Sequence, residues 1–414
     1  MVKDDVITGL DVGSTAVRAV VGQRIKGDGQ AQFHLIGVAE SPSEGISKGV
    51  ITSIEDAVSS ISACLEKAER MAGVPIEHAY VSISGVHVLS QTSRGVIAVS
   101  NANGEINEDD TKRVIDAAQA VATPPNYEIL HVIPRSYVVD SQPGIKDPIG
   151  MTGVRLEVEA QIIQGLSSQV RNLTKAIYRT GVDIDDLVLS SLAAAESVLT
   201  KRQKDLGVAL LNIGGATATM VVYEEGDVLH TYIIPIGSGH ITADIAIGLR
   251  TSMEVAEKIK LDYGSAVPDQ IERKDDINLN ELSETENGTV SRKHVAEIIE
   301  ARLEEIFQMA DKELKKINRS GMLPSGVVLT GGGAKLPGVV EVAKKQFRLP
   351  SSVGYPIGVT SSIERVNDPV FAVSVGLVVW GNRLREQGGQ SVNRFSSVKD
   401  VTNNMKKWFK SLMP

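Results

Sequence analysis

The feature that most constrains this 414-residue chain is a strand–turn–strand unit that occurs twice, about 200 residues apart. The first predicted strand, Val6–Leu10, ends at Asp11, and the chain turns through Gly13-Ser14-Thr15 into a second strand, Ala16–Gly22. The later copy has a strand at Gly207–Ile213, a turn at 214–217 and a strand at Ala218–Tyr223. A repeat at this spacing indicates duplication of a whole domain rather than a short solenoid repeat.

A third glycine-rich turn follows a later strand and leads into a helix. The predicted strand Val327–Thr330 ends at Gly331-Gly332-Gly333, and a helix is expected from Leu336 to Phe347. Any one such turn is most often only a structural turn. Two related hairpin turns and a strand–turn–helix unit in one chain are much harder to obtain by chance, so together they favour a common binding site.

The residue types in these turns suit a phosphate ligand. Glycine has no Cβ, so backbone N–H groups can approach a phosphate closely. Ser14, Thr15 and Thr217 add hydroxyl donors. Asp11 ends the first strand, where a carboxylate can hold Mg²⁺ directly or through its water ligands. Capping of the turn is an equally good interpretation of Asp11 from sequence alone.

Between the two copies the pattern changes to that of a separate α+β unit. Strands are expected at Arg94–Val99, Glu128–Asp140 and Val154–Gln164, around a helix at Asn107–Ala122 with an acidic first turn, which suits the helix dipole. Further helices are predicted at Ile54–Ala72, Ser168–Gly181, Leu187–Gln203 and Ser291–Asn318, and the apolar run 370–380 predicts a buried helix or strand. The predicted segments are 1–83, 84–165, 166–203, 204–243, 244–321, 322–387, a flexible linker at 388–397 and a helix at 398–414.

The turns carry a family resemblance. Gly9–Thr15 resembles the first phosphate loop of the actin and heat-shock-chaperone ATPase superfamily, Leu211–Thr217 resembles its second, and Val328–Gly338 resembles its adenosine motif. The resemblance implies an α/β fold of two ribonuclease-H-like halves that face each other across ATP and Mg²⁺, with Asp11 as the metal ligand. The cofactor-binding residues that it implies are Asp11, Gly13, Ser14, Thr15, Arg18, Asn212, Gly214, Gly215, Thr217, Glu257, Lys260, Gly331, Gly332 and Gly333.

Three of these residues have a plainer interpretation as well. Glu257 and Lys260 lie in Ala256–Lys260, which resembles the helix that holds the ribose and adenine. Their i, i+3 spacing also fits a surface ion pair. Arg18 faces either the phosphates or the outside of an exposed strand.

Within the superfamily, the inserted unit narrows the resemblance. Ser93–Ser100, Glu128–Arg135 and Gly144–Met151 closely resemble the small SHS2-type subdomain of the bacterial cell-division FtsA family, and the similarity covers nearly the whole chain. It implies an ATP-binding, filament-forming actin homologue that recruits the tubulin-like protein FtsZ to the cytoplasmic face of the inner membrane at the division site. Other division proteins are expected to bind as well.

Two departures from the superfamily pattern bear on hydrolysis. Asn212 stands where the superfamily usually has Asp, and Ala216 replaces a usual Gly. Ser190-Ser191 stand near the place where chaperone-type relatives carry Glu-Pro. General-base catalysis needs a group within hydrogen-bond reach of the water, and none is evident. The sequence therefore predicts ATP binding with slow or absent hydrolysis, and no catalytic residue.

Charge divides the chain into two parts. The net charge is −8, which argues against a general nucleic-acid binder. The chain has a single cysteine, Cys64, which excludes an internal disulfide and fits a reducing cytoplasm. Residues 395–414 carry four lysines and one aspartate, so they have a net charge of +3 while the remainder has −11. No run of 18 apolar residues occurs, so no transmembrane helix is expected.

The C-terminal helix is predicted to be amphipathic. Val398 and the apolar residues after it fall within an arc of about 100°, and the lysines lie outside that arc. Such a helix suits an anionic membrane surface, although amphipathic helices more often dock on their own domain. The residues expected at the membrane are Val401, Met405, Lys406, Lys407, Trp408, Phe409, Lys410 and Leu412.

The resemblance also implies a partner site and leaves two rival functions. FtsA relatives grip the C-terminal peptide of FtsZ with the helix that corresponds to Ser291–Asn318, and Arg302 and Glu305 fall at matching positions. The plainer interpretation of those charges is a solvated helix face. The rivals are a peptide-binding adaptor of the related pilus-assembly PilM family and a phosphotransferase on the same fold.

Overall fold

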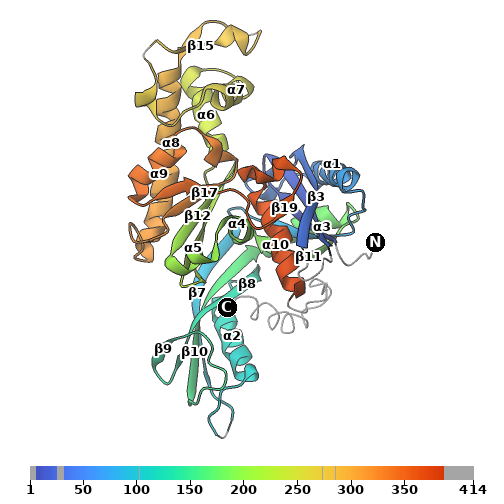
Figure 1. Cartoon of the computed structure of the whole chain (residues 1–414), viewed down its shortest axis with the longest axis vertical. Helices are drawn as coiled ribbons and strands as arrows, with labels where there is room; N and C mark the ends of the chain where they lie inside the picture. The colour runs from blue at the N-terminus through green and yellow to red at the C-terminus, as the bar shows by residue number, and fades with distance from the viewer. Residues whose placement is uncertain (1–5, 26–31, 102, 273, 285, 387–414) are drawn as a thin grey trace.

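The computed structural model describes residues 6–25, 32–101, 103–272, 274–284 and 286–386. Two β-sheets, each carrying one copy of the repeated hairpin, form the centre of the molecule (Figure 1). The first has the strand order β11-β6-β1-β2-β3-β19 and the second β14-β13-β12-β17-β18. The first-sheet strands are β11 (Asp183–Leu189), β6 (His78–Ile83), β1 (Val6–Val12), β2 (Ala16–Ile25), β3 (Gln32–Pro42) and β19 (Thr360–Ser361). The second-sheet strands are β14 (Asp227–Ile234), β13 (Ala218–Glu224), β12 (Val208–Ile213), β17 (Val327–Thr330) and β18 (Ser351–Val353).

The two sheets repeat one local topology. Strand β1 pairs antiparallel with β2 on one side and parallel with β6 on the other. Strand β12 pairs in the same way, antiparallel with β13 and parallel with β17. The predicted duplication of an α/β unit is therefore confirmed.

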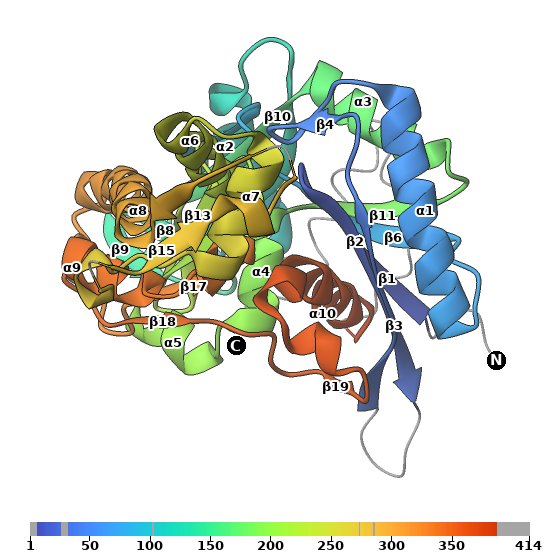
Figure 2. The ribbon, with the colours of Figure 1, turned by 90° about the horizontal axis from the view of Figure 1, so that it is seen from above.

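Helices fill the space between the sheets and cover the outer face of the first. Helix α1 (Ile54–Ala72) covers the first sheet on one side, and α4 (Ser190–Val198) and α10 (Ala372–Glu386) lie on the other side, between the sheets (Figure 2). Helices α4 and α10 approach so closely that a Cβ on Gly376 would come within 1.8 Å of the carbonyl oxygen of Ala193. This layer is part of the larger apolar core and ties the second half to the first.

A third sheet forms a separate unit at one end of the molecule (Figure 1). Its order is β7-β10-β8-β9, and α2 (Glu108–Ala122) covers it around a core that includes Tyr137 and Leu156. Asn107 caps α2 by accepting hydrogen bonds from the backbone N–H groups of Asp109 and Asp110. The strands are β7 (Val88–Ala98), β10 (Arg155–Leu166), β8 (Tyr127–Val139) and β9 (Gln142–Ile145).

The opposite end of the molecule is mainly helical (Figure 1). Its elements are α6 (Ser238–Leu249), α7 (Met253–Tyr263), the strand pair β15 (Asp276–Asn278) and β16 (Thr289–Ser291), and α8 (Arg292–Lys316). The remaining helices are α3 (Ser167–Tyr178), α5 (Lys201–Leu206) and α9 (Val339–Phe347). None of the helices in the described ranges is both long and apolar enough to cross a bilayer.

One part of the sequence interpretation needs correction, and another lies outside the described residues. The predicted helix Leu187–Gln203 is wrong at its start, because Leu187–Leu189 pair in parallel with β6 as the end of β11, and α4 begins only at Ser190. An apolar run without clear periodicity cannot distinguish a buried strand from a helix. The run 370–380 is helical, as α10. The predicted linker and C-terminal helix, residues 388–414, lie outside the described residues.

Candidate functional site

The two hairpin tips meet face to face. Both close in the same way: Gly13 donates its N–H to the carbonyl of Ala16 (3.2 Å), and Gly214 donates to that of Thr217 (2.9 Å). A Cβ on Gly215 would lie 2.0 Å from Thr15 Oγ1, so the tips are in direct contact only because residue 215 has no side chain.

One cavity lies between these tips. The predicted site residues that line it are Asp11, Gly13, Ser14, Thr15, Arg18, Asn212, Gly214, Gly215, Thr217, Gly331 and Gly332. The structure thus brings together eleven of the fourteen residues that the sequence suggested for one ligand.

Asp11 is held at the edge of the cavity by the neighbouring strand. Its Oδ1 accepts a hydrogen bond of 2.6 Å from Ser82 Oγ, and Ser82 Oγ in turn accepts one from the backbone N–H of Val12. Burial raises the pKa of the Asp11 carboxyl, against the opposing effects of the Ser82 hydrogen bond and the positive charge of Arg18. A bound cation next to this carboxylate would offset its loss of hydration.

Arg18 faces the cavity and is only partly paired. Its Nη2 lies 3.1 Å from Glu40 Oε1, and its guanidinium lies 5.9 Å from the ring centroid of Phe371. Its Nε is buried and makes no hydrogen bond to any described residue. The positive charge of Arg18 at the wall of a cavity with glycine turns suits an anionic oxygen, as a phosphate would supply.

Sequence reasoning missed several residues of the cavity. Ser84, Ser190, Thr219, Val370 and Val373 also line it. Ser190 was noted only as a departure from the superfamily pattern and was not assigned to the site, because the predicted helix ran through it without a boundary. Thr219 could have been found, because side chains two apart in a strand share a face, and Thr217 was already a candidate.

The third glycine turn packs on the second hairpin. Gly331 has φ of +84°, and a Cβ there would come within 2.3 Å of Asn212 Oδ1. Gly333 is not among the residues that line the cavity. It packs against Ile213, and a Cβ on Gly333 would lie 2.4 Å from Ile213 Cγ2. Glycine at 331 therefore permits both the left-handed turn and its contact with Asn212.

Glu257 and Lys260 lie behind the second tip rather than in the cavity. Lys260 is buried and donates hydrogen bonds to Glu257 Oε2 (2.6 Å), Thr242 Oγ1 (2.8 Å) and the carbonyl of Ser238 (3.4 Å). Ser238 donates its N–H to the Gly214 carbonyl. Lys260 is therefore buried, whereas the Glu257 side chain is 43% exposed, and the pair fixes the start of α6 against the hairpin tip.

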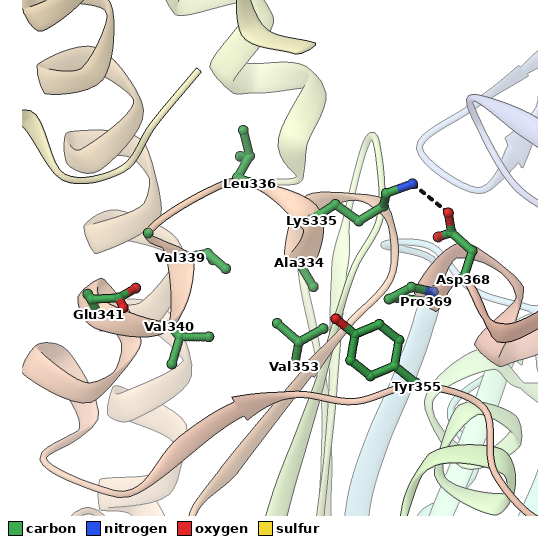
Figure 3. Close-up of a pocket in the computed structure, with 11 residues that line it drawn as sticks. Ala334, Lys335, Leu336, Val339, Val340, Glu341, Val353, Tyr355, Asp368 and Pro369 are labelled. Atoms are coloured by element: carbon green, nitrogen blue, oxygen red, sulfur yellow. Dashed lines mark hydrogen bonds and ion pairs between the residues drawn. The ribbon is translucent and has the colours of Figure 1, made fainter. Parts of the chain in front are cut away.

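A second cavity of about 600 Å³ borders the adenosine-type turn on another side (Figure 3). Lys335 of the turn pairs with Asp368 at 2.5 Å across one edge of this cavity, and Tyr355 lies beneath (Figure 3). The ion pair links the turn to the segment that enters α10. The two cavities share no lining residue.

Arg302 lines neither cavity and takes part in a network of charges on α8. Its Nε and Nη2 donate to the two carboxylate oxygens of Asp244 at 2.6 and 2.8 Å, and its Nη1 pairs with Glu305. These hydrogen bonds raise the pKa of Arg302. Ile247, one turn after Asp244 on α6, is 76% exposed.

The first cavity, of about 80 Å³, is smaller than a whole nucleoside triphosphate, but its lining suits phosphate groups and a magnesium ion. The glycine turns and the hydroxyl side chains match phosphate oxygens, and Asp11 matches a metal that takes most of its ligands from phosphate and water. The described residues hold no group of three or more His, Cys, Asp or Glu that could bind a metal alone. The residues predicted to reach the membrane, 401–412, lie outside the described part of the chain.

Comparison with known proteins places two family models on the chain. The model of the cell division protein FtsA matches residues 209–376, and that of the SHS2 domain inserted in FtsA matches residues 85–164. Curated relatives with the name cell division protein FtsA include one from Pseudomonas aeruginosa, 36% identical over 97% of both chains. Another, from Bacillus subtilis, is 37% identical over 95% of this chain and 87% of the relative.

Solved structures with low sequence identity share the fold. The PilM–PilN type IV pilus biogenesis complex matches with a TM-score of 0.66 and 16% identity, over 91% of this chain and 98% of that one. MreB5 of Spiroplasma citri bound to AMPPNP matches with a TM-score of 0.55 and 13% identity, over 93% and 98% of the two chains. The predicted actin-like architecture with an inserted small subdomain is therefore confirmed.

Proposed function

This chain belongs to the FtsA family of cell-division proteins, and we propose that it binds ATP with Mg²⁺ in the cavity between its two hairpin tips. The observation that carries the proposal is the convergence of two equivalent glycine turns on one cavity that Asp11 and Arg18 also line. The MreB5 structures of the same fold, bound to ADP and to AMPPNP, support nucleotide binding by this chain.

In the proposed complex each side chain has a separate task. The tip residues bind phosphate oxygens through backbone N–H groups and through the hydroxyls of Ser14, Thr15 and Thr217. Asp11 holds Mg²⁺, and the metal neutralises phosphate charge. Lys260 and Glu257 orient α6 behind the second tip; a direct contact of this pair with the ribose or adenine stays a prediction.

The role we propose for ATP is assembly rather than metabolism. ATP bridges the two halves, stabilises their closed arrangement and so favours head-to-tail contacts between copies. Such contacts do not close on themselves and produce filaments. Filament formation gathers many C-terminal helices on one polymer, and their combined affinity holds it at the cytoplasmic face of the inner membrane.

We further propose that the assembled protein recruits FtsZ and later division proteins at the division site. Arg302 and Glu305, with Asp244 and Ile247 beside them, would contact the C-terminal peptide of FtsZ. A phosphotransferase is less well supported, because Asp11 is the one acidic side chain among the residues that line the cavity. The curated relatives favour the FtsA role over the PilM-type role.

Co-sedimentation with vesicles tests these proposals together. The full chain should pellet with vesicles that contain anionic lipid, more strongly with Mg²⁺-ATP, and should carry a labelled C-terminal peptide of FtsZ into the pellet. Deletion of Lys399–Pro414 should leave the protein and the peptide in the supernatant. Pelleting that is unchanged by the deletion would exclude the C-terminal helix as the anchor.

A further inference from the structure

Three charged side chains form a row across the first sheet beside the cavity. Arg18 on β2 lies directly opposite Asp11 on β1, and on its other side it lies directly opposite Glu40 on β3. Residues directly opposite each other in antiparallel strands project from the same face of the sheet. One guanidinium therefore stands between two carboxylates. Asp11 and Arg18 are among the residues that line the cavity, whereas Glu40 is not.

Glu40 also binds a second cation, which comes from a distant part of the chain. Its Oε1 accepts a hydrogen bond of 3.1 Å from Arg18 Nη2, and its Oε2 accepts one of 2.6 Å from Arg365 Nη2. Charge-assisted bonds of this kind are usually about 2.7–2.9 Å long, so the bond to Arg365 is tight and the bond to Arg18 is loose. Arg365 lies on the short 3-10 helix Glu364–Asn367, just before α10, and does not line the cavity.

An aromatic ring lies beside both guanidinium groups. The ring centroid of Phe371 is 5.9 Å from Cζ of Arg18 and 5.5 Å from Cζ of Arg365, and the side chain is fully buried. A cation within about 6 Å of an aromatic ring is attracted to its face, without a fixed hydrogen-bond direction. The ring therefore keeps both arginines at this place but does not determine which anion each of them binds.

We propose that Glu40 competes with the phosphates of bound nucleotide for Arg18, and that Arg365 retains Glu40 when Arg18 changes partner; this rests on the ATP site proposed above. In the free protein Arg18 balances two carboxylates. With Mg²⁺-ATP in the cavity, Asp11 faces the metal and Arg18 faces a phosphate oxygen, so Glu40 needs another cation. Arg365 is already bound to it. Every charge in the row thus keeps an opposite charge in both states, and Glu40 acts as a positioning residue that limits the affinity for nucleotide.

Neutralising Glu40 tests the competition. Gln has the same shape, but a neutral acceptor binds a guanidinium about half as strongly as a carboxylate does. The side chains of Arg18 and Glu40 are 17% and 28% exposed, so water weakens their attraction only in part. Glu40→Gln should therefore bind Mg²⁺-ATP about 5-fold more tightly than wild type.

Two comparisons separate this competition from a general effect of charge. In an Arg18→Ala background, Glu40→Gln should change the affinity by less than about twofold, because the competition requires Arg18. The matched control is Glu364→Gln, which neutralises an exposed carboxylate beside Arg365 on the same short helix. This control should leave the affinity for Mg²⁺-ATP unchanged.

Removal of Arg365 provides the opposite arm. Without it, Arg18 is the cation that remains on Glu40, so Arg365→Ala should bind Mg²⁺-ATP about 5-fold more weakly although Arg365 does not line the cavity. Adding Glu40→Gln should restore the affinity to at least that of wild type, because the competing carboxylate is gone. A loss of folding would not be restored in this way. If the Arg18→Ala background binds too weakly to measure, this restoration decides.

Titration of each folded variant with a fluorescent ATP analogue and Mg²⁺ distinguishes the two levels of inference. If the wild type binds no ATP, the proposed site fails and the competition fails with it. If ATP binds but Glu40→Gln does not bind it more tightly, only the competition is overturned. An equal gain with and without Arg18 would also overturn it, because Glu40 would then act on the ligand through its charge alone. A loss in Arg365→Ala that persists with Glu40→Gln would overturn the role of Arg365.

Discussion

Replacing Asp11 with Asn should remove the magnesium-dependent part of nucleotide affinity and preserve the fold. Asn keeps the Oδ1 acceptor for Ser82, so the hydrogen bond of 2.6 Å and the end of β1 are preserved. The carboxylate is desolvated by burial, so its removal should leave the stability of the nucleotide-free protein equal or slightly higher.

The size of the effect follows from the charge that is lost. A carboxylate and a divalent cation about 4 Å apart, as through one water ligand, attract by roughly 8 kcal/mol at an effective dielectric constant of 20. Desolvation and rearrangement of water ligands offset most of this, so we expect a net loss of about 2–3 kcal/mol, or roughly 30- to 100-fold in affinity for Mg²⁺-ATP. Without the metal, the same carboxylate repels the phosphates, so Asp11→Asn should bind metal-free ATP as tightly as wild type or more tightly.

Titration of a fluorescent ATP analogue, with Mg²⁺ and with a chelator, measures both quantities. Asp11→Ala serves as the comparison, because it also leaves the Ser82 hydroxyl without its acceptor. A loss of affinity that is the same with and without Mg²⁺ would refute the reasoning and assign Asp11 a structural role.

Three further predictions follow from individual contacts. Gly215→Ala should weaken ATP binding by about 5- to 30-fold in the same titration, because overpacking by one methyl group costs about 1–2 kcal/mol at the contact with Thr15; full affinity would show that the tips need not touch. Arg302→Ala should abolish capture of the C-terminal FtsZ peptide in a pull-down, whereas Arg319→Ala, which removes a similar bidentate pair elsewhere, should not. Burial lowers the pKa of the His87 imidazole to about 4 in the folded protein, below its value in the unfolded chain. The neutral, buried His87 therefore contributes fully to stability above the unfolded pKa, and this contribution declines as the pH falls towards the folded pKa. His87→Gln should therefore reduce the loss of unfolding free energy between pH 7 and pH 5 by about 2 kcal/mol in denaturant titrations, and an unchanged pH slope would contradict this.

The sequence predicted those parts of the fold that depend on local chemistry. Helix α1 has the predicted bounds, because Ser53 caps its start and Gly73, with φ of +70°, ends it. The repeated hairpins were predicted for a similar reason, since apolar strands next to glycine turns leave few alternatives. The boundary at Ser190 was not predicted, because it depends on the parallel pairing of β11 with β6, a contact between segments about 100 residues apart.

The residues of the site likewise divide into those predicted from local motifs and those placed by tertiary packing. The two hairpin tips and the third turn have glycine-rich motifs in the sequence and converge on the cavity as predicted. Ser190 and Thr219 belong to no such glycine motif and reach the cavity only through packing of α4 against β13. Lys260 was predicted as a nucleotide contact from a helix motif. Its burial against Thr242 and Ser238 became visible only once α6 and α7 were placed together.

A crystal structure of the chain with Mg²⁺ and a non-hydrolysable ATP analogue tests the central claim most directly. We predict that the phosphates lie between the tips 13–15 and 214–217, with the metal next to Asp11 and the nucleoside towards 331–333. Nucleotide bound elsewhere on the molecule, with the cavity between the tips filled by side chains, would contradict the proposed site.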